Sequence, residues 1–438
     1  MVASSVLLQT VLDLRRFYAQ EVFTGIGAAI ARKRFVVKAV FFIITIGRRS
    51  FIFNYTLLFG ILLFSRLFKY PKKDSFIFQY AATRNNVIAL KKLNGCLPQN
   101  IIDGISLNFR SASVLDRLVA GLSFRSVARA ASALRRNHHV DPLVHLRCSI
   151  GAAACVLYAR RPVPNSVRVL CVASDHSPVC RALISLFGSQ GKKTCYVQHA
   201  PVTKHFPPLS TDLSVLYDEK SVDAYRLSAE RAGVPFDARI VLMPPFIESF
   251  QRPAVKAGPV RVGVCLSRLP KMKELRRVLY DIAAVDNVAS IVLRRHPACR
   301  LNISSLLSIL KVSEQVSGDS LSQFSQCIDL ALVPNSGVAI ELLHAGVPTF
   351  YCKGVDDVPE DYYGFVSDGV LPVFDGRIFD GYSTTAHFFN EDWGARFSKY
   401  DVTVYRRVDE CRSDVAVEFG RLLSSTIPDS DGFSRNVV

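Results

Sequence analysis

Two short polar segments, each directly after an apolar run, contain the residues best suited to bind a charged ligand. Segment 294–300 holds three arginines and a histidine, and clustered charges of one sign are costly unless an anion neutralises them. Segment 334–341 combines a hydroxyl, a glycine and the start of a helix, where outward-facing N–H groups hold anions. Both segments indicate a phosphate-bearing, nucleotide-activated ligand. The predicted donor-binding residues in them are His296, Arg300, Ser336, Gly337 and Glu341.

Two more donor-binding residues, Ser267 and Arg268, follow the apolar run 260–265 and are expected to reach the same ligand. Local alternatives stay open for several of these residues. Ser336 could serve only as a helix cap, and Glu341 could bind a ribose or lie exposed. A histidine such as His296 is often structural, although the proline after it stiffens its loop.

Catalytic residues are expected in the first half of the chain, where His199 follows the predicted strand 193–198. An imidazole titrates near working pH, so His199 could act as general base on an acceptor hydroxyl. Asp175 follows the predicted strand 167–173 and stands next to His176. It could orient a histidine, act as base itself, or only begin a turn. The predicted catalytic residues are therefore His199 and Asp175.

The elements that position these residues alternate between apolar strands and helices from residue 165 onward. Such alternation predicts parallel sheets with right-handed crossovers, and parallel sheets bind ligands at the carboxyl ends of their strands. Residues 244–259 are rich in proline, as linkers are, so the fold class is α/β with two Rossmann-like domains that face a cleft. The predicted parts are basic hydrophobic helices at 1–73, an acceptor domain at 74–250, a nucleotide-donor domain at 251–375, and a C-terminal extension with a helix at 376–438.

The N-terminal 73 residues carry twelve Lys and Arg against two acidic residues, which is most of the net charge of +17. Their longest uncharged stretch, 50–65, would form a helix of roughly 24 Å, shorter than the ~30 Å hydrocarbon core. These features favour an appendage that associates with a membrane surface, and 36–68 could either span the bilayer or lie on it. A buried helical hairpin is the alternative. Nucleic acid is not expected as a partner, because the charges are interleaved with apolar residues.

The eleven cysteines are scattered without C-x-x-C pairs, and the Asp-x-Asp pattern Asp429-Ser430-Asp431 lies in the last ten residues, outside the predicted strands and helices. Free thiols in apolar strands behave as small hydrophobic groups, which indicates a reducing compartment. No metal site and no cofactor are therefore expected. Apolar residues make up 49% of the chain and charged residues 21%, proportions that exclude a disordered protein.

Five of these elements, in this order, resemble motifs of the two-Rossmann-domain (GT-B) transferases that build bacterial surface polymers. The resemblance covers 165–355 and is closest to the capsule-type sialyltransferase and polysialyltransferase group and to the CDP-glycerol glycerophosphotransferases. Its motifs are Asp175-x-Ser177-Pro178, Tyr196-Val197-Gln198-His199, Leu266-Ser267-Arg268, Arg295-His296-Pro297, and Asn335-Ser336-Gly337 through Glu341 followed by Gly346-Val347-Pro348.

The resemblance implies that the His-Pro and serine-loop elements bind a cytidine nucleotide, and that the histidine at 199 is the base. Three features depart from the families. Ala200 stands where the glycerophosphotransferases have glycine, a single serine precedes Gly337, and the acidic pair of the sialyltransferases is missing upstream of His296.

These observations predict a metal-independent, inverting glycosyltransferase that moves a sugar from a cytidine-nucleotide donor to a cell-surface polysaccharide or lipid-linked glycan, as in capsule biosynthesis. The partners are then a nucleotide-sugar donor, a glycan or lipid-linked acceptor, and a membrane surface contacted through 1–73. The expected location is the cytoplasmic face of the inner (plasma) membrane, as a peripheral or single-pass protein. Three alternatives remain: a CDP-glycerol or polyol-phosphate transferase, a UDP-sugar 2-epimerase, and a non-catalytic nucleotide-binding membrane subunit.

Overall fold

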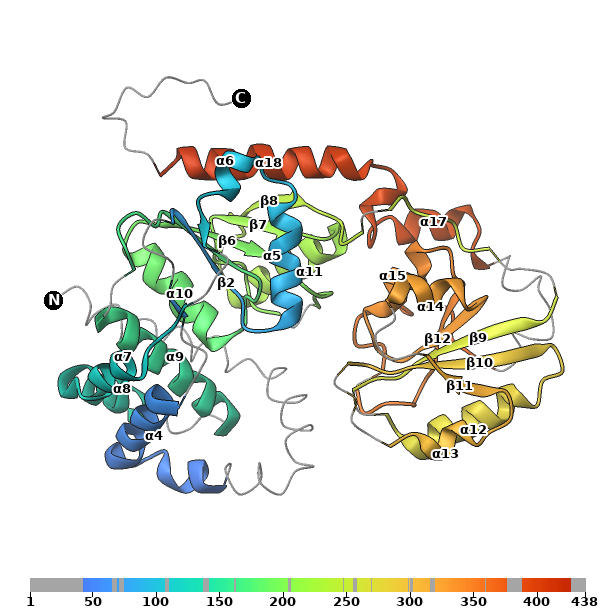
Figure 1. The fold of residues 1–438 in the computed structure, drawn as a ribbon, viewed down its shortest axis with the longest axis horizontal. Coiled ribbons are helices and arrows are strands. Elements are labelled where there is room, and N and C mark those ends of the chain that lie inside the picture. The colour runs from blue at the N-terminus through green and yellow to red at the C-terminus, as the bar shows by residue number, and fades with distance from the viewer. Residues whose placement is uncertain are drawn as a thin grey trace.

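The structure is a computed structural model that describes part of the chain. The described residues are 42–64, 69–70, 75–106, 110–136, 142–160, 163–203, 206–246, 248–254, 258–268, 270–297, 299, 302–315, 320–358, 360–375 and 388–426. Figure 1 shows two α/β lobes, each built around a twisted sheet. The predicted fold class, two Rossmann-like domains with parallel sheets, is confirmed by the strand pairing within each lobe.

The N-terminal sheet has six parallel strands in the order β3-β2-β5-β6-β7-β8. Continuous apolar runs form its central strands, because helices cover both faces and leave no wet side. The strand order changes direction between β2 and β5, so the ligand crevice of this sheet lies at their carboxyl ends. The strands are β2 (Ile77–Tyr80), β3 (Ile105–Ser106), β5 (Val169–Val172), β6 (Lys193–Val197), β7 (Leu213–Leu216) and β8 (Arg239–Leu242).

The C-terminal sheet has five parallel strands in the order β11-β10-β9-β12-β13, which is the Rossmann order. Its direction changes between β9 and β12. The sequence pattern predicted four of these strands and missed the short β11 at the edge. The strands are β9 (Val260–Cys265), β10 (Val288–Arg294), β11 (Val312–Glu314), β12 (Leu330–Val333) and β13 (Thr349–Tyr351).

The helices of each lobe pack on its own sheet. In the C-terminal lobe they are α12 (Met272–Ala283), α13 (Ser304–Leu307), α14 (Leu321–Gln326), α15 (Val338–His344) and α17 (Glu391–Phe397). In the N-terminal lobe, the sheet is covered by α5 (Arg84–Asn94), α6 (Gln99–Ile102), α10 (Pro178–Ser189) and α11 (Glu219–Ala232).

The last helix, α18 (Val408–Ser424), returns to the N-terminal lobe, as Figure 1 shows. It buries Val415, Phe419 and Leu422 in the same core as Leu213 of β7 and Val241 of β8. These spacings of four and three residues place the three side chains on one helix face. The chain therefore crosses between the lobes twice, once through the linker near 245–254 and once before α18.

Four helices form a group beside the N-terminal sheet: α4 (Phe51–Phe64), α7 (Val114–Gly121), α8 (Phe124–Arg136) and α9 (Pro142–Arg160). The chain also forms a short antiparallel pair there, β1 (Lys69–Tyr70) with β4 (Arg110–Ser111). Leu58 and Leu62 of α4 are fully buried in the N-terminal core, and the amide of buried Asn54 lies 2.7 Å from Nε2 of His145 on α9. One face of α4 therefore packs against the protein core. None of the helices in the described part of the chain combines the length and the apolar character needed to cross a bilayer.

Candidate active site

The carboxyl ends of β9 and β12 lie side by side at the point where the C-terminal sheet changes direction. Ser267 and Arg268 follow β9, and Ser336 and Gly337 follow β12. Ser267 is buried, whereas Arg268 reaches solvent. Four of the predicted donor-binding residues therefore gather at one sheet edge, where an open α/β fold binds ligands.

The loop around Ser336, between β12 and α15, forms hydrogen bonds within its own domain. Oγ of Ser336 accepts a long hydrogen bond from N–H of Val338 at 3.4 Å, but the N-cap residue of the seven-residue helix α15 is Gly337, which has no side chain to cap it. Asn335 donates to the hydroxyl of Tyr351 and accepts from N–H of Tyr362. These contacts hold the loop within its own domain, and they are not the helix cap that the sequence left open as the alternative for Ser336.

Gly337 permits a close approach between the two domains. A Cβ atom at this position would lie 2.7 Å from Cγ of Pro201, which belongs to the loop after β6 in the N-terminal domain. Contacts below 3.0 Å are not tolerated, so any larger residue must push Pro201 away. The sequence assigned Gly337 to a phosphate, and the structure places a loop of the other domain against it.

The arginines after β10 are already engaged by the protein. Arg295 forms an ion pair with Glu314 and also donates from Nη2 to Oε2 of Glu314 at 3.0 Å. Arg294 donates to Gln315 and lies over the ring of Phe324. Arg295 therefore needs no external anion, because β11, which sequence reasoning missed, supplies the counter-charge of Glu314, whereas the contacts of Arg294 are with neutral groups.

His296 and Arg268 lie close enough at the donor edge to interact electrostatically, and Arg300 lies outside the described residues. The pKa of His296 is lowered, first because protein atoms displace water from part of the ring and second because the charge of Arg268 is close. An anion bound between the two side chains would offset this repulsion.

Asp175 forms the centre of a buried polar cluster at the N-terminal edge. It accepts from the ring of His176 at 2.9 Å and from the hydroxyl of Tyr225 at 2.7 Å, and the hydroxyl oxygens of Tyr225 and Tyr196 lie 3.2 Å apart. Burial acts to raise the pKa of Asp175, but the hydrogen bond and charge of His176, with help from Tyr225 and Arg181, lower it overall. Asp175 is only 4% exposed. Its geometry thus fits a residue that orients a histidine better than a base that meets substrate.

His199 lies beside this cluster, with its ring stacked 6.3 Å from that of His176. Nδ1 of His199 is buried and has no hydrogen-bond partner among the described residues. The pKa of His199 is lowered to about 4, first by burial and second by the neighbouring His176, while Asp175 and the carbonyl of Ala173 act in the opposite direction. The ring is therefore neutral near pH 7 and able to accept a proton.

One cavity of about 250 Å³ joins the two edges. His199, Ala200 and Pro201 line it from the N-terminal domain, and Gly337 and Glu341 line it from the C-terminal domain. Sites for small molecules commonly measure about 300–1,000 Å³. This cavity is thus large enough for the reacting groups of two substrates and too small for a complete nucleotide sugar.

Glu341 stands on α15 between both domains. Its pKa is raised because surrounding protein limits its hydration, although the charges of Lys92 and Arg294 oppose the rise. Lys92 donates to the carbonyl of Pro245 in the linker, and burial lowers its pKa against the effect of Glu341. Sequence reasoning missed Lys92, because nothing distinguishes it from its neighbour Lys91 on α5.

Asp218 is a second residue that sequence reasoning missed. It lines the same cavity and caps α11 by accepting from N–H of Ser221 at 2.7 Å. Burial raises the pKa of Asp218 to about 7, although the hydrogen bonds from Ser221 favour the charged form. Its position directly after the strand β7 was the available signal.

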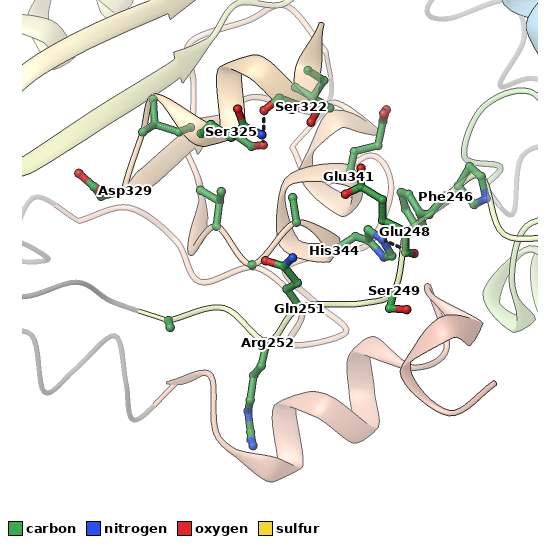
Figure 2. A pocket seen from close by; sticks show the side chains of 18 residues that line it. Phe246, Glu248, Ser249, Gln251, Arg252, Ser322, Ser325, Asp329, Glu341 and His344 are labelled. Carbon is green, nitrogen blue, oxygen red and sulfur yellow. Dashed lines mark hydrogen bonds between the residues drawn. The ribbon is translucent and has the colours of Figure 1, made fainter. Parts of the chain in front are cut away.

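A larger cavity of about 570 Å³ lies between the linker, α14 and α15, as Figure 2 shows. It extends to Asp329 and Val347 at the amino ends of β12 and β13, away from the ligand edge. His344 closes one side, where it stacks 3.8 Å from Phe246 and lies 2.6 Å from Asp401. Glu341 lines both cavities. Because the larger cavity extends away from the ligand edge, the smaller one remains the candidate active site.

No protein-family model matches this chain, and no curated protein matches it significantly. Among solved structures, it is similar to a putative UDP-N-acetylglucosamine 2-epimerase from Listeria monocytogenes, with 13% identity and a TM-score of 0.44 over 82% of this chain and 98% of that one. It is also similar to CalG4, the calicheamicin glycosyltransferase, with 11% identity and a TM-score of 0.45 over 81% of this chain and 100% of that one. Likenesses this distant identify no activity, and the fold assignment rests on the strand orders.

Proposed function

We propose that this chain is a nucleotide-sugar glycosyltransferase of the GT-B type, with its reaction centre in the 250 Å³ cavity between the domains. One observation carries the proposal: His199, whose Nδ1 has no hydrogen-bond partner among the described residues, lines a cavity that Glu341 lines from the opposite domain. A group transfer between two substrates needs an acceptor site and a donor site that meet at one point.

On the donor side, Arg268 and His296 would hold the phosphates at the carboxyl end of β9, and Glu341 would accept hydrogen bonds from the ribose. When the bond between the sugar carbon and the phosphate oxygen breaks, its electron pair stays on the phosphate. Preorganised cations stabilise that charge as it develops. The cations of the chain would thus do the work that a metal ion does in other transferases.

On the acceptor side, His199 would take the proton of the acceptor hydroxyl as the new carbon–oxygen bond forms. The imidazolium that results is stabilised by Asp175, whose charge raises the pKa of His199. Asp175 also holds His176 through the 2.9 Å contact, so His176 stays in place beside the reacting ring. Direct attack from the face opposite the leaving group would invert the sugar carbon.

The finer parts of the proposal rest on the sequence. A cytidine nucleotide as donor follows from the motifs around His296 and Ser336, and a cell-surface polysaccharide or lipid-linked glycan as acceptor follows from the resemblance that they carry. The basic region 1–73 supports a location at the cytoplasmic face of the plasma membrane.

The experiment is a donor assay with the purified full-length protein. CMP-sialic acid, CDP-glycerol and UDP-GlcNAc are each incubated with candidate glycan acceptors, and nucleotide release and products are followed. We expect acceptor-dependent release of CMP from the sialic acid donor. Arg268→Gln should weaken donor use, whereas Arg277→Gln, a change of an exposed arginine on α12, should not.

Other outcomes would replace the proposal. Transfer from CDP-glycerol would make the chain a polyol-phosphate transferase, and conversion of UDP-GlcNAc without acceptor would make it an epimerase. Tight nucleotide binding without turnover of any donor would indicate a non-catalytic subunit.

A further inference from the structure

Helix α7 has its large apolar side chains outside and its small ones inside. Val114, Leu115 and Val119 are 50–70% exposed. Ala120 and Gly121, in contrast, are buried against the neighbouring helices. A surface helix that faces water shows the reverse arrangement, with apolar residues toward the core. The outer face of α7 is thus built to contact something other than water.

This face continues onto α4, which runs antiparallel to α7. Nη1 of Arg117 donates to the carbonyl of Leu63 at 2.7 Å, and a Cβ atom on Gly121 would touch the ring of Phe59. The rings of Tyr55 and Phe124 lie 5.9 Å apart at the far end of the contact. Figure 1 shows α4, α7 and α8 together at one side of the N-terminal lobe.

We call the exposed apolar residues of this region the α4–α7 face. Eleven of the nineteen large apolar side chains exposed on the described residues belong to it, and all eleven lie within 42–64 and 114–124. Monomeric soluble proteins rarely expose contiguous apolar patches above a few hundred Å². The face consists of Phe42, Ile43, Ile46, Ile52, Phe64, Val114, Leu115, Leu118, Val119, Leu122 and Phe124.

The charges around the face have one sign. Arg49, Arg125 and Arg129 are exposed next to its apolar residues. Within 42–64 and 113–136 the only acidic residue is Asp116, which is used in the capping box of α7 with Ser113. Apolar side chains inside a basic rim match the interface of a membrane with anionic headgroups.

We propose that the α4–α7 face docks on an anionic lipid membrane and lies in its interface without spanning it. The sequence placed the membrane contact in 1–73 alone, whereas half of this face comes from α7 and the start of α8. Two other occupants of this face, residues 1–41 of this chain and a second copy of the chain, are disfavoured because both are basic. Residues 1–41 hold six Lys and Arg against two acidic residues, and a second copy would present the same basic rim. The proposal does not depend on the transferase function.

The test measures binding of the full-length protein to sedimented phosphatidylcholine vesicles, with and without phosphatidylglycerol. We expect binding that rises with the anionic lipid and falls with salt. Leu115→Asp combined with Leu118→Asp should weaken binding at least about tenfold, because burial of both side chains is lost. The matched control is Leu310→Asp, a 75% exposed residue of the C-terminal domain, which should bind as the wild type does.

A second pair of variants tests the charge. Arg125→Gln with Arg129→Gln should lower binding roughly thirtyfold, since each basic residue near an anionic surface contributes about 1 kcal/mol. Arg276→Gln with Arg277→Gln, two exposed residues of α12, should leave it unchanged.

Two results would overturn the proposal. One is wild-type vesicle binding by both the leucine and the arginine variants of the face. The other is a lipid-free dimer that Leu115→Asp converts into a monomer, since a second copy would then cover the face. Because all these residues are exposed, circular dichroism should show that the variants keep the fold.

Discussion

The carboxyl edges of the two sheets both contribute residues to the candidate active site, but the residues differ in kind. The C-terminal edge was conspicuous in the sequence, yet Glu314 and Gln315 engage two of its arginines. The N-terminal edge carried few sequence signals, yet it holds a preorganised cluster around Asp175 and a histidine nitrogen with no hydrogen-bond partner in the described part of the chain. Cationic motifs in the sequence thus indicate where a ligand binds. Buried polar contacts in the structure indicate which side chain can take up a proton.

The difference also separates the expected defects of variants at the two edges. Changes at the N-terminal edge should lower the rate of the chemical step. Changes at the C-terminal edge should weaken the binding of the donor. Each of the following variants tests that division.

The largest effect is expected from His199→Gln. Removing a general base costs about 10²–10⁴-fold in rate, and we expect that loss in kcat with an unchanged donor KM. Steady-state nucleotide release measures both constants. His296→Gln at the C-terminal edge should instead raise the donor KM and leave kcat nearly unchanged. A large loss of kcat in that variant would contradict the assignment of the two edges to different steps.

Asp175→Asn should rank second. The amide keeps the size of the side chain but loses the negative charge that favours a protonated His199. A unit charge several ångströms away contributes about 1–3 kcal/mol at an effective dielectric constant of about 20, so kcat should fall about ten- to a hundredfold. Tyr225→Phe removes one donor to the same carboxylate and should cost less. Equal or greater loss in Tyr225→Phe would mean that packing of the cluster, and not the charge of Asp175, limits the rate.

Arg268→Gln should raise the donor KM about tenfold, because one charge-assisted contact to phosphate is lost. Turnover at saturating donor should change little. Calorimetric titration with CMP or CDP gives the binding defect directly, and Arg277→Gln is the matched control. An unaltered affinity in Arg268→Gln would remove the C-terminal edge from the donor site.

The smallest effect concerns the contact between the edges. Gly337→Ala places a methyl group 2.7 Å from Cγ of Pro201, and overpacking of this kind costs about 1–3 kcal/mol in unfolding free energy. Pro201→Ala removes the Cγ and Cδ atoms, so the double variant should recover much of the loss. Urea unfolding measures the stabilities. Gly188→Ala, in a helix with no atom within 4 Å of the new methyl group, should not destabilise.

Much of the fold was predictable because its central strands are buried on both faces and therefore appear as continuous apolar runs. The edge strands β3 and β11 have two and three residues, too few to show a pattern. The return of α18 to the N-terminal sheet was also missed, since periodicity shows that a helix has an apolar face without showing which sheet receives it.

The site was predictable only where residues directly follow strands. His199, Asp175, Arg268 and Ser336 were found by that rule. Lys92 was missed because it comes from the last turn of a helix, α5, and its neighbours in space, Pro245 and Glu341, are far away in the sequence. The partner of Arg295 was missed for a similar reason, since pairing with Glu314 depends on the unrecognised strand β11.

The central claim is that His199 faces the donor across the cavity, and a histidine NMR titration tests it most directly. In the free protein we predict that the pKa of His199 lies at about 4, well below the ordinary 6.5, because burial and His176 disfavour the charged ring. A bound anionic nucleotide favours the protonated ring, so CMP or CDP should raise that pKa. The His199→Gln variant assigns the resonance. A His199 resonance with an ordinary pKa, or one that stays unmoved when nucleotide saturates the protein, would contradict the account.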